Sequence, residues 1–365
     1  MPDTGSGKKK VLVAPLDWGL GHTTRAIPII HSLLQRGHQV CLAGNSQQKS
    51  LLQAEFPQLT YLPLAGYGVK YGVSAVQTAA LLLRQIPQIW AAIQAEKQWL
   101  AQMMAVHSFD AVISDNRYGL YHPKAHCTII THQLRIQAPV AAGLVQRLHF
   151  SLLQKFNACW VPDVAGAPGL AGALSHPHRL PAMPLHYVGP LSRFATGQPQ
   201  PEQSGLLVLL SGPEPQRTLF ENILLPQLAN AKMPVTLVRG LPGSQQLLAP
   251  IPGVQVFNHL PTKDLQEAMQ RASLVVCRSG YSSVMDLAAL GKRSIVVPTP
   301  GQTEQAYLAR HLHQSGFALA QQQQGFDLKK ALEKAAHFAY HFPEPGTTDL
   351  LAAALDEWEA NASSI

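Results

Sequence analysis

A histidine that could carry a proton follows two glycines near the start of the chain. Residues 19–25 read Gly-Leu-Gly-His-Thr-Thr-Arg, from Gly19 to Arg25. Gly19 and Gly21 allow positive φ angles and a close approach of the backbone to a ligand. The imidazole of His22, with an ordinary pKa of about 6.5, can remove a proton from a hydroxyl group at neutral pH. Asp17 is either an alternative base or the group that orients His22.

Polar residues follow two later apolar runs in the same half of the chain. Asp115, Asn116 and Arg117 come after the run 111–113, and His132 comes after the run 128–130. We expect these side chains either to meet a substrate or to steady His22. The structural alternative is that they cap the helices and loops that follow.

The second half contains a segment suited to binding a phosphate. An apolar run ends at Cys277, an Arg-Ser-Gly turn follows at 278–280, and a helix is expected to begin near Ser282 or Ser283. The free N–H groups of such a helix start, together with the positive end of the helix dipole, bind anions. Gly280 lets the backbone approach the ligand closely.

The same order of a strand, a glycine-containing turn and a helix is expected in both halves of the chain, and these elements position the residues named above. A buried run at 11–14 enters a glycine-containing turn and a helix through about Arg36, and a run at 206–210 enters the turn 211–214 and a helix to about Ala229. Six further apolar runs lack the alternation of half-exposed strands and indicate parallel sheets. These runs are residues 40–42, 111–113, 128–130, 235–238, 274–277 and 294–297.

Two doubly wound α/β domains with Rossmann-like topology follow from this alternation of strands and helices. We expect a first domain at 1–192, a linker at 193–204, a second domain at 205–345, and a C-terminal helix at 346–365 that packs back on the first domain. Ligands of such domains bind beyond the carboxyl ends of the strands, so the chemistry is expected in a cleft that the two domains face.

Residues 274–316 resemble the donor domain of glycosyltransferase family 28, and weaker similarity covers most of the chain. The resemblance rests on Arg278-Ser-Gly280, on Asp286 with its small-residue tail to Gly291, on the run ending at Pro298, and on the pair Glu304-Gln305. It implies the GT-B architecture, with the acceptor in the first domain and a nucleotide sugar in the second. The best-known member adds N-acetylglucosamine from UDP to a lipid-linked muramyl precursor.

The resemblance also implies roles for single residues. Asp286 would accept hydrogen bonds from the ribose hydroxyls, where the family usually has the longer glutamate, and Glu304 and Gln305 would bind the donor sugar. The other implied donor contacts are Ser211, Gly212 and Arg217 at the pyrophosphate, Arg278, Ser279, Gly280, Tyr281, Ser282 and Ser283 around the phosphate turn, and Asn258 near the base. Structural alternatives remain open, because Arg278 could be a surface arginine, Asp286 a solvated carboxylate, and Glu304 a charge favoured by the helix dipole.

The activity that follows is transfer of a sugar from a UDP-sugar to a hydroxyl acceptor, with inversion at the anomeric carbon. His22 matches the family's histidine that faces this carbon. UDP-sugar is a substrate, no cofactor is expected, and no metal is expected because the sequence contains no Asp-x-Asp motif. In the family the acceptor is linked to a polyprenyl lipid.

The composition narrows the partners. Residues 1–200 contain 16 Lys and Arg against 7 Asp and Glu, whereas residues 201–365 contain 12 against 14. A basic first half attracts anionic lipid or pyrophosphate, and the absence of nucleic-acid-binding motifs makes nucleic acid the least favoured partner. We expect no signal peptide at the N-terminus. The four cysteines are widely spaced, and Cys41, Cys127 and Cys277 are expected to be buried thiols, so we expect a cytoplasmic protein.

Two apolar stripes could contact a membrane from the cytoplasmic side or simply pack in the core. The first is Leu83, Ile86, Trp90 and Ile93, in a helix that Pro87 should kink or divide, and the second is Val140, Leu144, Leu148, Leu152 and Phe156. Insertion of one apolar face beside basic residues would give reversible peripheral binding.

Two rival functions stay open on the sequence alone. The loop at 19–25 also matches the Gly-x-Gly-His-x-x-Arg loop of the sugar-nucleotide hydrolase of pseudaminic acid synthesis, in which water replaces the acceptor. The other rival is a non-catalytic protein that binds a nucleotide sugar, because a fold does not determine a function.

Overall fold

The computed structural model describes residues 7–69, 75–137, 142–194, 205–246, 248–342 and 349–362. The chain forms two compact units, of which the first comprises residues 1–69, 84–191 and 346–365 and the second comprises residues 70–83 and 192–345. The division after Leu191 falls one residue from the boundary expected from the sequence. Residues 70–83, which the sequence assigns to the first domain, group with the second unit, and most of the expected linker, residues 195–204, lies outside the described residues.

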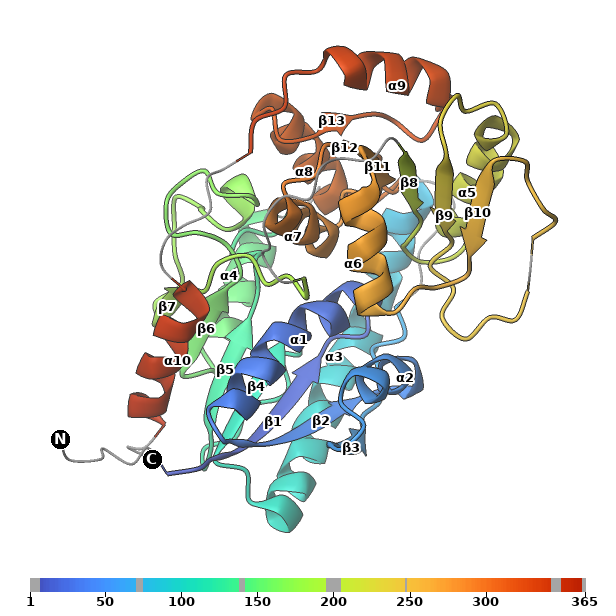
Figure 1. Cartoon of the computed structure of the whole chain (residues 1–365). Helices are drawn as coiled ribbons and strands as arrows, with labels where there is room; N and C mark the ends of the chain where they lie inside the picture. Colours follow the sequence, from blue (N-terminus) through green and yellow to red (C-terminus); the bar gives the residue numbers. More distant parts are fainter. Residues whose placement is uncertain are drawn as a thin grey trace. The chain divides into compact units, whose positions relative to one another are not determined.

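The first unit is built on a sheet of seven parallel strands in the order β3-β2-β1-β4-β5-β6-β7. The strands are β1 Lys10–Pro15, β2 Gln39–Gly44, β3 Thr60–Pro63, β4 Ala111–Asp115, β5 His126–Ile130, β6 Ala158–Val161 and β7 Leu185–Tyr187. The helices are α1 Leu20–Gln35, α2 Ser46–Glu55, α3 Ala75–His107, α4 Ala142–Leu153 and α10 Leu350–Asn361, with a short 3₁₀ turn at Gly172–Leu174. Figure 1 shows α1 and α3 on opposite sides of this sheet.

The core of the first unit forms because the strands are apolar on both faces. Strand residues such as Leu12, Val112 and Ile129 are fully buried in one cluster with Leu100 of α3 and Leu153 of α4. Burial on both sides of a sheet is typical of parallel strands covered by crossover helices.

The last helix belongs to the first unit, as expected from the sequence. Arg36, which ends α1, donates to Asp356 (2.6 Å) and Glu359 (3.2 Å) of α10. His38 contacts Glu359 through Nε2 (2.8 Å), and Trp358 is buried against the rings of His38 and His126.

The second unit has six parallel strands in the order β10-β9-β8-β11-β12-β13. The strands are β8 Leu206–Leu209, β9 Val235–Val238, β10 Val254–Phe257, β11 Leu274–Cys277, β12 Ser294–Val296 and β13 Leu319–Ala320. The helices are α5 Gln216–Leu228, α6 Thr262–Arg271, α7 Tyr281–Leu290, α8 Thr303–Gln314 and α9 Leu328–His337. Leu206, Val208, Val276 and Ile295 are the fully or nearly fully buried centre of its core.

All eight strands expected from the sequence form, within two residues of their expected bounds, and both units have the expected doubly wound topology. The other five strands, β3, β6, β7, β10 and β13, were not expected from the sequence. α3 continues through Pro87, so the expectation that this proline could divide the helix is wrong. The four cysteines are buried and free, as was expected of Cys41, Cys127 and Cys277.

The expected apolar stripes are only partly buried. On α3, Ile93 is 5% exposed in the core, whereas Ile86 is 56% and Trp90 49% exposed. On α4, Leu144 and Leu148 are 69% and 51% exposed, and beyond its end Phe156 is buried. The side chains of Leu83 and Val140 lie outside the described residues. Among the helices that the structure describes, none has the length and apolar character needed to span a membrane.

Candidate functional site

His22 and Asp115 lie at the carboxyl ends of neighbouring strands in the first unit. β1 and β4 are adjacent, with Pro15 opposite Asp115, and the strand order changes direction between these two strands. Ligands of doubly wound sheets bind at such a switch point. Gly19, with a φ angle of 84°, is the N-cap of α1 and turns the chain so that His22 enters the first turn of the helix.

Four side chains meet at this switch point. Nε of Arg25 donates to Oδ2 of Asp115 at 2.6 Å, and Nη2 of Arg25 donates to Oδ1 of the same carboxylate. Nδ1 of His22 lies 3.1 Å from that Oδ1 and 2.8 Å from Nη2 of Arg25. Nη1 of Arg25 lies 3.3 Å from Nδ1 of His132. The structure thus brings Asp115 and His132 to His22, and Arg25 is the side chain that connects all of them.

The charges of this cluster act on one another because the cluster is buried. The side chains of Arg25 and Asp115 are 2% and 3% exposed, and that of His22 is 16% exposed. Although burial opposes the charged form of Asp115, the guanidinium of Arg25 and the ring of His22 hold the pKa of Asp115 well below its usual range. Burial lowers the pKa of His22, the carboxylate of Asp115 opposes this, and the charge of Arg25 adds to the lowering.

Asp17 and Arg117 form hydrogen bonds that were not expected from the sequence. The carboxylate of Asp17 accepts a hydrogen bond from the backbone N–H of Tyr67 (3.1 Å) and bonds to this turn rather than to His22. Arg117 is fully buried and donates to Glu96 (2.9 Å) and to the carbonyl of Pro15 (2.8 Å). The side chain of Arg117 therefore connects the end of β1 to α3.

Asn116 follows the cluster directly in the chain, and Glu96 is the partner of Arg117. Asn116 adopts a φ angle of 54°, a left-handed conformation that asparagine tolerates, directly after Asp115 at the end of β4. The sequence gives no local signal for Glu96, because it lies within the long α3 and its partner Arg117 is distant in the chain. Arg25, by contrast, follows His22 by one helical turn, so that spacing was a usable signal for their contact.

The phosphate turn of the second unit lies at the same kind of edge. β8, β11 and β12 are adjacent and parallel, so the turns after their carboxyl ends come together. Gly212 has a φ angle of 102°, and a Cβ added there would lie 3.7 Å from Oγ1 of Thr299. α7 begins at Tyr281, one residue earlier than expected, with Gly280 as its N-cap. Gly280 has no side chain to cap the first amides, and Ser282 and Ser283 are partly exposed.

Gln305 holds the loop after β12 in place. Its Oε1 accepts from the backbone N–H of Thr299 (2.9 Å), and its Nε2 donates to Gln302. Its backbone carbonyl accepts from Oγ of Ser279 (2.9 Å), which is fully buried. The side chain expected on the donor sugar is therefore engaged within the protein, whereas Glu304 lies partly exposed in the first turn of α8.

Arg278 is buried and is therefore not a surface arginine. It is 1% exposed, and Nη2 donates to the carbonyl of Gln216 at 2.8 Å. Nη1 donates to the carbonyls of Val297 (3.3 Å) and Pro298 (3.4 Å), and the guanidinium stacks over Phe220. Burial lowers the pKa of Arg278 to about 10. Through these hydrogen bonds the buried side chain of Arg278 connects the turn after β11 to the segments that follow β8 and β12.

Arg217 and Asn258 are also used within the second unit. Arg217 is 5% exposed and pairs with Glu214 (2.6 Å) and Glu221 (3.1 Å), so the expected contact of its side chain with a pyrophosphate is not supported. The amide of Asn258 donates to the carbonyls of Ser244 and Gln246, both at 2.9 Å, and fixes the loop after β9. Of the remaining donor residues, Ser211 is partly exposed at the end of β8.

Asp286 is buried and already has a partner. It is 7% exposed, and Oδ1 accepts a hydrogen bond from Oγ of Ser192 at 2.7 Å, while Nε of Arg193 lies 3.7 Å from Oδ2. Burial raises the pKa of Asp286, opposed by the charge of Arg193 and the bond from Ser192. The alternative of a solvated helix carboxylate is therefore wrong.

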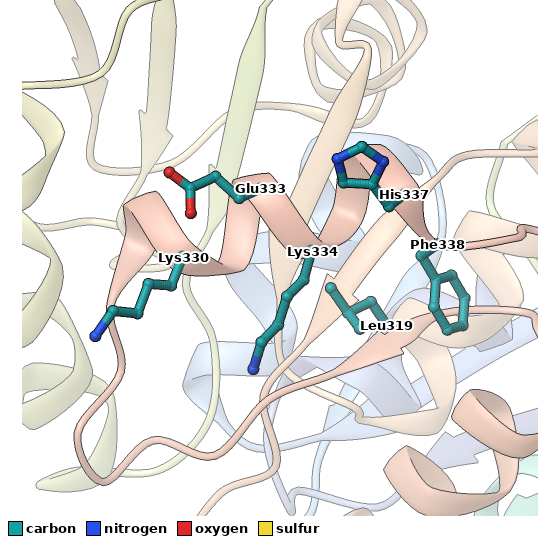
Figure 2. Close-up of a pocket in the computed structure, with 6 residues that line it drawn as sticks. All are labelled: Leu319, Lys330, Glu333, Lys334, His337 and Phe338. Atoms are coloured by element: carbon teal, nitrogen blue, oxygen red, sulfur yellow. The ribbon is translucent and has the colours of Figure 1, made fainter.

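A shallow hollow on the second unit lies apart from these residues. Its lining comes from α9 and β13, and Figure 2 shows Lys330 and Lys334 pointing away from Glu333 and His337. β13 is the edge strand, separated from β11 by β12. No residue expected in the site from the sequence lines this hollow.

Comparison with known proteins agrees with the geometry of the second unit. The glycosyltransferase family 28 C-terminal domain matches residues 240–345. The UDP-N-acetylglucosamine--N-acetylmuramyl-(pentapeptide) pyrophosphoryl-undecaprenol N-acetylglucosamine transferase of Haemophilus ducreyi is 25% identical over 338 residues, which cover 89% of this chain and 88% of the relative.

Solved structures of glycosyltransferases share the fold across nearly the whole chain. CalG4, the calicheamicin glycosyltransferase, has a TM-score of 0.61 at 16% identity and is matched over 98% of this chain and 99% of its own. Acinetobacter baumannii MurG has a TM-score of 0.52 at 16% identity, over 98% of this chain and 94% of its own. The chain is therefore a glycosyltransferase with the GT-B fold, and its sequence resembles glycosyltransferase family 28.

Proposed function

We propose that the chain transfers a sugar from a UDP-sugar to a hydroxyl group of an acceptor, with the donor held by the second unit and the acceptor by the first. The observation that carries the proposal is the turn from β11 into α7, where the N-cap is Gly280, a residue with no side chain to hinder the approach of a phosphate. It lies within the residues that match family 28, and helix starts of this kind bind phosphate.

In the proposed reaction the acceptor oxygen attacks the anomeric carbon of the donor. The bond between this carbon and the diphosphate oxygen breaks, UDP leaves, and the configuration at the carbon inverts. Nε2 of His22 takes the proton of the attacking hydroxyl group, while Nδ1 faces Asp115. The amides and dipole at the start of α7 stabilise the charge of the departing diphosphate, so the proposal includes neither a metal nor a cofactor.

The acceptor in this proposal is carried on a lipid pyrophosphate. The Haemophilus ducreyi relative is named for a pyrophosphoryl-undecaprenol acceptor. The basic balance of residues 1–200 favours an anionic acceptor, and the exposed side chains of Trp90 and Leu148 suit contact with a membrane surface. We place the enzyme at the cytoplasmic side of a membrane.

The rival functions are less well supported. The matched relative and the two solved structures described above are all transferases, so we do not retain the sugar-nucleotide hydrolase. A non-catalytic binding protein would have no need for a histidine held by a buried Asp–Arg pair at a strand-order switch point.

A thermal-shift screen of nucleotide sugars tests the donor site, because a ligand that binds the native state raises its melting temperature. We expect UDP and UDP-hexoses to raise it and the corresponding GDP compounds to have little effect. Equal shifts with both nucleotides, or none with UDP, would overturn the donor assignment.

A further inference from the structure

Arg25 contacts all three of the other side chains at the switch point, those of His22, Asp115 and His132. Its guanidinium spans both oxygens of Asp115 through Nε and Nη2, and its remaining contacts are the rings of His22 (2.8 Å) and His132 (3.3 Å). A guanidinium stays charged and can only donate hydrogen bonds. Its side chain is 2% exposed, so water does not screen this charge from the imidazole.

A carboxylate alone beside a histidine stabilises the imidazolium form, because opposite charges attract. Here the carboxylate of Asp115 is also paired with a bidentate arginine, whose charge opposes the stabilisation that the carboxylate gives to a proton on His22. The nearest guanidinium nitrogen lies closer to Nδ1 of His22 than the carboxylate oxygen does, at 2.8 Å against 3.1 Å. The charged and titratable groups that face His22 are Asp115 of β4, Arg25 of α1 and His132 after β5.

We propose that Arg25 is a positioning residue that keeps His22 an uncharged base, by fixing the carboxylate of Asp115 and by placing a permanent positive charge beside Nδ1 of the imidazole. In the neutral ring Nε2 carries the lone pair when Nδ1 holds the proton and donates it to Oδ1 of Asp115. The role as a base rests on the proposed function, whereas the uncharged state of His22 is a property of the free protein.

The first test measures the protonation of His22 in the free protein by NMR titration of its ring carbons and nitrogens. In the wild type we expect His22 to titrate below its ordinary pKa of about 6.5. Arg25→Gln leaves the carboxylate of Asp115 alone with the imidazole, so we expect the proton affinity of His22 to rise at least tenfold. Arg25→Lys retains the charge and should keep most of the wild-type behaviour.

Arg36→Gln is the matched control, because Arg36 lies at the far end of α1 and pairs with α10. It should leave the titration of His22 unchanged. The proposal is overturned if wild-type His22 titrates above pH 6.5, or if Arg25→Gln leaves its proton affinity unchanged or lowers it. If Arg25→Gln does not fold, the proposal can still be overturned by a wild-type His22 that titrates above pH 6.5.

The second test is kinetic and concerns the reaction. The acidic limb of the pH profile of kcat/KM should move to higher pH in Arg25→Gln by the same factor as the NMR titration, because kcat/KM reports groups of the free enzyme. If the NMR titration of His22 shifts but the kinetic profile does not, His22 is not the base of the reaction. The claim that His22 is uncharged in the free protein would still hold. A kinetic limb that moves while the titration stays fixed would overturn the role of Arg25.

Discussion

Oγ of Ser192 donates a 2.7 Å hydrogen bond to Oδ1 of Asp286, the carboxylate that the family resemblance assigns to the donor ribose. Ser192 is the residue at which the chain enters the second unit after the first. If the ribose hydroxyls bind Oδ1 of Asp286, they compete with the hydroxyl of Ser192, because the carboxylate is only 7% exposed and Ser192 already contacts this oxygen. Donor binding would then release the start of the unit from α7.

Ser192→Ala should strengthen the binding of UDP. A hydrogen bond of this kind contributes about 0.5–1.5 kcal/mol, and removing the need to break it should lower the Kd roughly twofold to tenfold. Isothermal titration calorimetry with UDP measures the change, and Ser315→Ala on the same unit is a control that should have no effect. Weaker binding by Ser192→Ala would show that Ser192 supports the site rather than competes for it.

Ser283→Asp should weaken nucleotide binding while it stabilises the helix. An acidic residue in the first turn of α7 interacts favourably with the helix dipole and stabilises the helix by about 0.3–1 kcal/mol. The same negative charge repels a diphosphate bound at these amides. We expect a Kd for UDP at least tenfold higher together with an unchanged or raised melting temperature. Lys329→Glu, in the first turn of α9, is the matched control and should not alter the Kd. Retained affinity in Ser283→Asp would place the diphosphate elsewhere.

Asp115→Asn should destabilise the first unit most at neutral pH. Removing the carboxylate leaves Arg25 buried without its counter-charge, which costs about 3–5 kcal/mol. The folded-state pKa of Asp115 is lowered, so its stabilisation is complete above the unfolded pKa of about 3.9 and is lost as the pH falls toward the folded value.

The difference in unfolding free energy between wild type and Asp115→Asn should therefore shrink from pH 7 to pH 3. Urea denaturation followed by tryptophan fluorescence measures it, because all 5 tryptophans lie in the first unit. A difference that is constant over this range would mean that Asp115 has no lowered pKa.

Leu148→Ser should weaken association with anionic vesicles. Burying a leucine side chain in an apolar phase contributes about 1.5–3 kcal/mol, so roughly a tenfold loss of partitioning is expected if this residue enters the membrane. Co-sedimentation with phosphatidylcholine vesicles, with and without phosphatidylglycerol, measures it. Leu180→Ser is a control of similar exposure, at 54% against 51%. Equal loss in both variants would remove the membrane role of α4.

The fold could be predicted because its central strands are continuous apolar runs buried on both faces. Most of the missed strands lack that pattern, whereas β6, Ala158–Val161, has it and was also missed. Val254–Phe257 of β10 has partly and fully exposed residues in alternation at the edge of its sheet, and Leu319–Ala320 of β13 contains only two residues. Such short or half-exposed strands depend on a neighbouring strand that the local sequence does not specify.

Site residues could be predicted where their position depends on a backbone feature such as a strand-to-helix turn. They could not be predicted where the position of a long side chain depends on a partner that is distant in the sequence. His22 and Gly280 are fixed by strand-to-helix turns that are visible in the sequence. Arg117 and Arg278 stand at the ends of strands, yet both point inward, because Glu96 and the carbonyl of Val297 accept their hydrogen bonds. These partners are remote in the sequence, so local spacing could not reveal them.

The most direct test of the account compares His22→Ala with wild type for both UDP binding and sugar transfer. General bases typically contribute about 10²–10⁴-fold to a rate, so we expect kcat to fall at least a hundredfold while the Kd for UDP stays within a factor of two. His31→Ala, an exposed histidine on the same helix, is the control and should transfer sugar at the wild-type rate. Wild-type turnover by His22→Ala would contradict the account.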